Sequence, residues 1–108
     1  TPLAHGSSRR VFSEQTAEKL QELLAGVVAE GTGRQAAPSE GTAAGKTGTA
    51  QTGQFRDGEE LKNYWFAGFY PAEKPRWTIV VMQDAQTEPE VSSAAVFARL
   101  CDALSAGE

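Results

Sequence analysis

Residues 44–51 read Ala44-Gly45-Lys46-Thr47-Gly48-Thr49-Ala50-Gln51, and we interpret them as part of an extended strand. Because side chains alternate between the two faces of a strand, Thr47 and Thr49 fall on one face and Lys46 and Gly48 on the other. Two hydroxyls can then converge on one ligand anion, and the lysine adds positive potential nearby. Gly48 lets a neighbouring backbone or a ligand approach closely. This strand is therefore predicted to border a binding site.

A helix is predicted before this strand. Ser13 has the properties of an N-cap, and Glu14 in the first turn is favoured by the helix dipole. The apolar residues that follow recur at intervals of three and four: Ala17, Leu20, Leu23, Leu24, Val27 and Val28. Gly31 and Gly33 end the pattern, and residues 32–43 are expected to form a loop.

Two more strands and a second helix are predicted after it. Residues 52–60 are polar and are expected to form a turn, followed by strands over 64–70 and 77–82. Both strands alternate poorly between apolar and polar residues, which is typical of strands buried on two faces. Short connections favour an antiparallel arrangement, and Ser92 or Ser93 is expected to cap a final helix. The expected fold class is α+β. A three-stranded antiparallel sheet, with one helix before it and one after it in the sequence, forms a single domain over 1–108.

Composition excludes several classes of function. The chain has 108 residues, 40% of them apolar, which is enough for one small domain. Ten basic and fourteen acidic residues are scattered and give a net charge of −4, so we expect no nucleic-acid partner. No apolar run reaches membrane-spanning length and no targeting segment is recognised. The one histidine, His5, has no nearby metal-ligand pattern, so we expect no metal and no cofactor.

Lys46-Thr47-Gly48 matches one of the three signatures of penicillin-binding proteins and serine β-lactamases. The match extends, in order and spacing, over residues 10–14, 16–17, 27–33, 44–51, 65–72 and the valine strand at 77–82. Over roughly 10–104 the chain resembles the C-terminal part of the transpeptidase domain of a class B, monofunctional penicillin-binding protein, in the serine β-lactamase and DD-peptidase superfamily. A fragment of the β-lactamase/transpeptidase-like fold is thus expected.

The resemblance implies roles for four residues of the strand. Lys46 and Thr49 would be catalytic, with the Thr49 N–H as one oxyanion donor and Lys46 hydrogen-bonded to the serine of a Ser-x-Asn element. Thr47, Gly48 and Thr49 would bind the carboxylate end of a D-Ala-D-Ala-like stem peptide or a β-lactam. Gln51, two residues beyond Thr49 on the same face, is expected to extend this wall, with a plain surface glutamine as the alternative. The function implied is peptidoglycan cross-linking by serine acyl transfer.

The other two signatures are absent from these residues. No serine is followed three residues later by lysine, and Asn63, the one asparagine, has Leu61 two residues before it. The chain alone is therefore expected to be inactive and to need the remainder of the transpeptidase domain as its partner, with self-association as a further expectation. The resemblance implies a membrane-anchored parent on the outer face of the cytoplasmic membrane. A β-lactam-sensing or binding module and a serine β-lactamase fragment are the alternatives.

The other notable residues are expected to have structural roles. A P-loop would need glycine at the position of Glu40, so nucleotide binding is not favoured. Cys101 lies on an apolar helical stripe and is expected to be buried rather than reactive. The aromatic residues of the last two strands are expected to be core and sheet packing: Trp65, Phe66, Phe69, Tyr70 and Trp77. Solvated turns are expected at Glu59, Glu60, Glu88 and Glu90.

Overall fold

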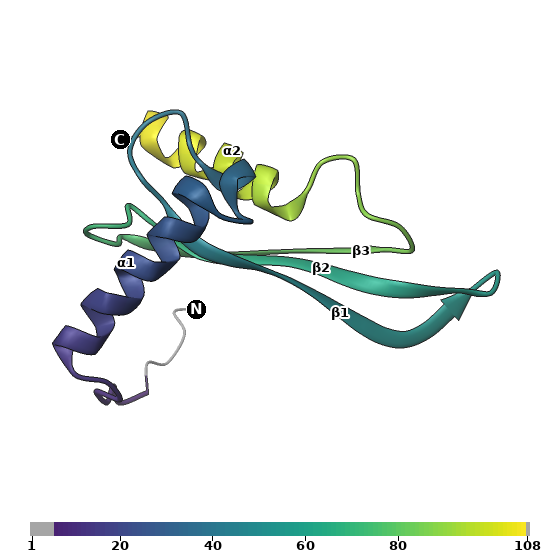
Figure 1. The fold of residues 1–108 in the computed structure, drawn as a ribbon, viewed down its shortest axis with the longest axis horizontal. Coiled ribbons are helices and arrows are strands. Elements are labelled where there is room, and N and C mark those ends of the chain that lie inside the picture. The colour runs from purple at the N-terminus through teal and green to yellow at the C-terminus, as the bar shows by residue number, and fades with distance from the viewer. Residues whose placement is uncertain (1–5, 108) are drawn as a thin grey trace.

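The computed structural model describes residues 6–107 and contains two long helices and a three-stranded sheet (Figure 1). Its elements follow the predicted order, with one short 3₁₀ helix added: α1 (Glu14–Glu30), η1 (Arg34–Ala36), β1 (Ala44–Arg56), β2 (Glu59–Tyr70), β3 (Trp77–Ala85) and α2 (Ser93–Ala106). No helix within 6–107 is both long enough and apolar enough to cross a bilayer.

The ends of α1 and α2 are determined by local capping. The Ser13 side chain accepts a hydrogen bond from the Thr16 N–H at 3.1 Å, and the Gly31 N–H donates to the Val27 carbonyl at 3.0 Å. Both predicted ends of the first helix are confirmed. At α2 the choice between two serines is resolved, because Ser92 accepts from the Ala95 N–H at 3.0 Å and is the N-cap.

The sheet is an antiparallel meander in the order β1-β2-β3. Thr47 is paired with Phe66 and Phe66 with Val81, so these three residues share one face. The predicted α+β class is confirmed, with the described helices and antiparallel sheet as expected.

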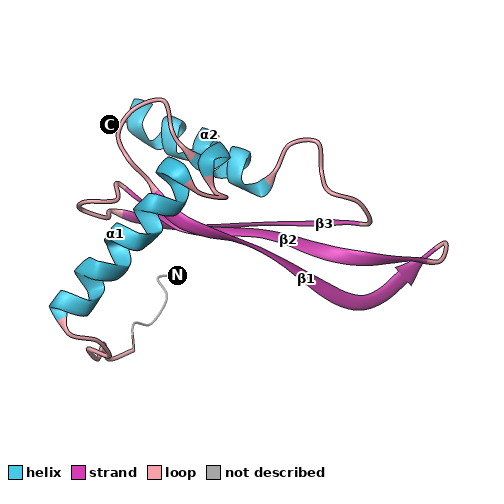
Figure 2. Ribbon diagram, viewed as in Figure 1, coloured by secondary structure: helices cyan, strands magenta, loops and turns pink. Residues whose placement is uncertain are grey.

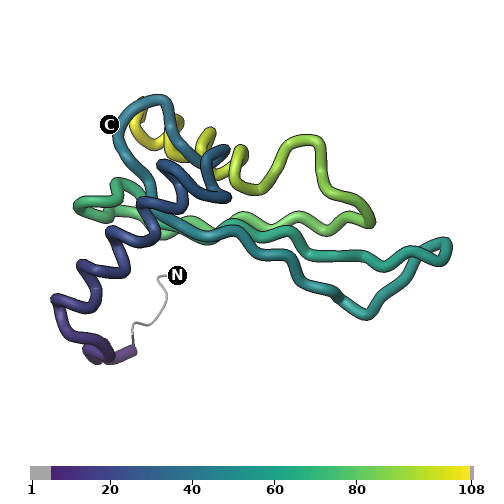
Figure 3. The backbone as a smooth tube through the Cα atoms, in the orientation of Figure 1, coloured from purple at the N-terminus to yellow at the C-terminus, as the bar shows by residue number. Residues whose placement is uncertain are grey.

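The turn predicted over 52–60 is wrong. β1 continues to Arg56 and β2 begins at Glu59, leaving a tight turn at Asp57 and Gly58, which have φ angles of 54° and 82°. Two consecutive residues with positive φ suit the right-handed twist of a two-residue hairpin. β3 ends at Ala85, opposite Lys62. β1 and β2 continue beyond this point as a two-stranded ribbon that projects from the body (Figure 3). Polar residues are tolerated in this ribbon because both of its faces meet solvent.

The core lies between one face of the sheet and the helices (Figure 2). Phe66 of β2 and Phe97 of α2 are fully buried, with ring centroids 4.6 Å apart, and Val28 of α1 joins the same cluster. Cys101 is also fully buried here, which confirms its structural interpretation. Burial, together with the negative charge of Asp102, raises the pKa of the Cys101 thiol to about 11.

The opposite face of the sheet is open in residues 6–107. Trp65, Val80 and Met82 are 37%, 57% and 46% exposed and share this face through the strand register. The assignment of Trp65 to the core is therefore wrong, whereas Phe66 and Tyr70 are buried as predicted. Burial in β3 alternates regularly from one residue to the next. The sequence predicts strands buried on both faces, but in this chain only one face of the sheet is buried.

Candidate functional site

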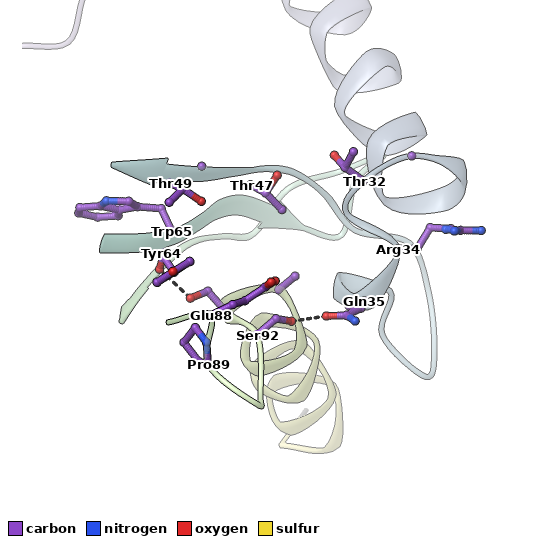
Figure 4. Close-up of a pocket in the computed structure, with 14 residues that line it drawn as sticks. Thr32, Arg34, Gln35, Thr47, Thr49, Tyr64, Trp65, Glu88, Pro89 and Ser92 are labelled. Atoms are coloured by element: carbon purple, nitrogen blue, oxygen red, sulfur yellow. Dashed lines mark hydrogen bonds between the residues drawn. The ribbon is translucent and has the colours of Figure 1, made fainter. Parts of the chain in front are cut away.

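A pocket of about 330 Å³ lies where β1 and β2 meet the loop after α1 and the segment that leads into α2 (Figure 4). The strands contribute Thr47, Gly48, Thr49, Tyr64 and Trp65. The loop after α1 contributes Gly31, Thr32, Arg34 and Gln35. The segment around the start of α2 contributes Glu88, Pro89, Ser92, Ser93 and Ala94. Three parts of the chain that are distant in sequence thus enclose one space.

The two threonines line this pocket from the same face of β1. Thr47 is opposite Phe66 and Thr49 is opposite Tyr64, so both lie on the face that carries the core. Thr47 is half-buried and Thr49 is exposed. Within residues 6–107, β1 is an edge strand, and alternate backbone groups along such a strand point away from the sheet and can pair with a ligand.

Lys46 belongs to the opposite face of β1, but its side chain reaches back to Thr47. Its Nζ donates to the Thr47 carbonyl at 3.2 Å and to the Thr47 Oγ1 at 3.3 Å. Because Oγ1 acts as the acceptor in this contact, its own proton remains free to be donated to an anion. The Lys46 ammonium and the Thr47 hydroxyl therefore lie side by side, an arrangement that can bind an anion.

The wall formed by α2 is held against the sheet by side-chain hydrogen bonds. Ser93 is 4% exposed; its Oγ donates to the Tyr64 carbonyl at 2.7 Å and accepts from Gln83 Nε2 at 3.1 Å. Ser92 hydrogen-bonds the side chain of Gln35, which links α2 to η1. These contacts hold the start of α2 and the loop after α1 at the edge of the pocket.

The structure places most, but not all, of the predicted site residues together. Thr47, Gly48 and Thr49 line the pocket, and Lys46 contacts Thr47 from outside it. Gln51 lies farther along β1, opposite Lys62, and does not line it.

Several lining residues were not identified from the sequence. The sequence predicts a loop at Arg34 and Gln35 and a solvated turn at Glu88, yet all three residues line the pocket. Glu88 is exposed, yet its loop folds back so that it borders the pocket. No local motif signals this placement, since it depends on how the loop packs against the sheet.

No group of three or more potential metal ligands gathers within residues 6–107. His5 lies outside the residues that the structure describes.

Comparison with known proteins identifies the family. Residues 4–102 match the family described as "Transpeptidase: Penicillin binding protein transpeptidase domain", so the chain belongs to this family. It is 41% identical over 81 residues to stage V sporulation protein D of Bacillus subtilis (strain 168), covering 72% of this chain and 12% of that protein. It is 41% identical over 90 residues to penicillin-binding protein PbpB of Mycolicibacterium smegmatis (strain ATCC 700084 / mc(2)155), covering 70% and 13%.

A solved structure agrees with this assignment. The D,D-transpeptidase domain of a peptidoglycan glycosyltransferase from Eggerthella lenta matches with a TM-score of 0.64 and 36% identity over 88% of this chain and 21% of that one. The resemblance inferred from the Lys-Thr-Gly strand is thus confirmed at the level of family and fold. The chain spans only 12% and 13% of the length of the two relatives in B. subtilis and M. smegmatis.

Proposed function

We propose that this chain forms the substrate-carboxylate wall of a penicillin-binding DD-transpeptidase, which cross-links peptidoglycan by serine acyl transfer. One observation carries the proposal: Thr47 and Thr49 line a pocket from one face of an edge strand, with the Lys46 ammonium 3.3 Å from the Thr47 hydroxyl. Two hydroxyl donors beside a cation suit the terminal carboxylate of a D-Ala-D-Ala-like stem peptide or the carboxylate of a β-lactam.

The same strand would serve the chemical step. The Thr49 N–H is proposed as one oxyanion donor, Lys46 as a partner of the Ser-x-Asn serine, and Gln51 as an extension of the wall. A tetrahedral oxyanion needs two donors, and the loss of one costs about 3 kcal/mol of transition-state stabilisation. The remainder of the domain would supply the second donor and the nucleophile in its Ser-x-x-Lys and Ser-x-Asn elements. The parent protein is proposed to be membrane-anchored, with this domain on the outer face of the cytoplasmic membrane.

The chain alone is expected to form no covalent adduct with penicillin, because none of its serines is followed three residues later by lysine. Intact-mass spectrometry after incubation with a fluorescent penicillin would measure this. A stoichiometric mass increase of one penicilloyl group would contradict the expectation.

The carboxylate role is tested in the intact transpeptidase domain with Thr47→Val and Thr49→Val, which remove one hydroxyl each at nearly constant volume. A hydrogen bond to a charged group is worth about 1.5–3 kcal/mol, so each variant should lower the second-order rate of penicillin acylation by about ten- to a hundredfold. Thr78→Val is the matched control, since Thr78 is exposed on the opposite face of the sheet. Rates within about twofold of wild type for both site variants would refute the role.

The same domain also distinguishes the alternatives. A transpeptidase should retain the penicilloyl group for many minutes and release the terminal D-alanine of a stem peptide when an amine acceptor is present. Rapid turnover of the penicilloyl group would instead indicate a β-lactamase, and stable acylation without activity on stem peptides would indicate a sensor.

A further inference from the structure

The pocket extends well beyond the two threonines. Thr47 and Thr49 form its strand side, while Glu88 and Pro89 lie on the opposite side in the loop that follows β3 (Figure 4). A carboxylate bound at the threonines would fill only part of a space of about 330 Å³. The next group of the ligand would therefore approach the loop that carries Glu88.

Glu88 is the charged group that such a substituent would meet. The ionisable residues among those lining the pocket are Arg34, Tyr64 and Glu88. Figure 4 shows the Arg34 side chain directed away from the pocket, whereas Glu88 lies between the strand and α2. Ser92 and Gln35 hydrogen-bond each other, and Ser93 bonds Tyr64, so these polar neighbours are already engaged. Within residues 6–107 the Glu88 carboxylate has no hydrogen-bond partner of its own.

We propose that Glu88 determines the charge preference of this site, favouring ligands with a cationic group next to the bound carboxylate. The inference rests on the proposed function, because it takes the carboxylate position from Thr47 and Thr49. The threonines and Lys46 attract the ligand carboxylate at one side of the pocket, and Glu88 attracts a cation at the other. An anionic substituent would be repelled by Glu88 to a similar degree. Glu88 thus acts on specificity and takes no part in the acyl transfer itself.

The cephalosporin ring provides a suitable probe because its C3 carbon is bonded directly to the carbon that carries the carboxylate. The experiment compares two cephalosporins with the same C7 side chain, one with a pyridiniomethyl group at C3 and one with a neutral acetoxymethyl group. Second-order acylation rates are measured on the intact transpeptidase domain, with a penicillin that has no such substituent as the reference. The readout is the acylation rate with the pyridiniomethyl cephalosporin divided by the rate with the acetoxymethyl cephalosporin.

Glu88→Gln keeps the shape of the side chain and removes its charge, so the ratio should fall by about three- to fivefold, the effect of one partly exposed ion pair. Glu88→Lys should lower the ratio further, by about tenfold or more relative to wild type. Both decreases should become smaller as the salt concentration is raised. The penicillin rate reports how the same variants act on the shared carboxylate, an effect that cancels in the ratio of the two cephalosporin rates. Glu90→Gln removes the same charge from the same loop at an exposed residue that does not line the pocket, and it should leave the ratio unchanged.

An unchanged ratio in both Glu88 variants, with penicillin still acylating them, would overturn the charge preference and leave the proposed function intact. An equal change in Glu90→Gln would also overturn it, because the net charge of the loop would then be the cause. A wild-type domain that no β-lactam acylates would refute the proposed function itself.

Discussion

The Ser93 hydroxyl at the start of α2 donates a hydrogen bond of 2.7 Å to the carbonyl oxygen of Tyr64 on β2. Tyr64 is the register partner of Thr49, so this bond connects the C-terminal helix to the strand position next to the candidate site. Ser93 is buried and also accepts from Gln83, which makes it a junction between α2, β2 and β3.

Ser93→Ala is expected to destabilise the fold, because it leaves the Tyr64 carbonyl and the Gln83 amide without this partner. An unsatisfied buried polar group costs about 1–3 kcal/mol, and the free energy of unfolding should fall by that amount in urea titrations. Ser8→Ala, at an exposed residue before α1, is the control and should change stability by less than about 0.5 kcal/mol. Equal stabilities for the two variants would show that the junction does not contribute.

Gly45→Ala should separate β1 from β2. A Cβ at Gly45 would lie 2.6 Å from both the Ala67 carbonyl oxygen and the Phe66 ring, which leaves it no room. Overpacking of this kind costs about 1–3 kcal/mol, and the shift of the strand should also slow acylation of the intact domain.

Gly48→Ala lies three residues along the same strand and serves as the control for stability. Its Cβ would meet nothing closer than the Trp65 Cβ at 4.0 Å. Thermal unfolding of both variants would measure the difference, and a Gly45→Ala protein as stable as Gly48→Ala would contradict the packing seen between these strands.

Stability should decline in alkali because of Cys101. Its pKa is raised from an ordinary value of 9.0 to about 11, so folding favours the protonated thiol. Below about pH 9 the thiol is protonated in both the folded and the unfolded state, so its ionisation does not yet reduce the free energy of unfolding. Between pH 9 and 11 the unfolded thiol ionises first, and stability should fall with a slope of up to about 1.4 kcal/mol per pH unit.

Cys101→Ala isolates this contribution, because every other titratable group is unchanged in the variant. The variant should be less stable than wild type at pH 7, where it leaves a small cavity, but its stability should fall less steeply above pH 9. Parallel pH profiles for the two proteins would mean that the thiol ionises normally in the folded state.

The open face of the sheet predicts association of the isolated chain. Trp65, Val80 and Met82 expose apolar surface on one face, and extended apolar patches are uncommon on soluble monomers. Size-exclusion chromatography with light scattering at micromolar concentration should show species larger than a monomer. The double variant Val80→Thr and Met82→Gln should shift them toward monomer, and a wild-type chain that is already monomeric, with no dye binding to apolar surface, would contradict the prediction.

Local rules were sufficient to predict much of this protein from its sequence. Capping by Ser13 and Gly31 depends on backbone groups within one helical turn, so the ends of α1 could be predicted from the local sequence. The side-chain period of a strand likewise placed Thr47 and Thr49 on one face, where the structure has them. The Lys-Thr-Gly strand and its flanking segments indicated the family because their order and spacing can be read directly along the sequence.

Only the tertiary structure decided which distant segments meet those threonines. Gln35 reaches the pocket because η1 packs against α2, to which the Ser92–Gln35 hydrogen bond joins it. Glu88 reaches it because the start of α2 is bonded to β2 through Ser93. Trp65 and Phe66 are adjacent aromatic residues in sequence, yet one is exposed and the other buried, because the helices cover a single face of the sheet. Propensity describes what a residue favours locally, whereas burial and pocket lining depend on which surfaces are packed together.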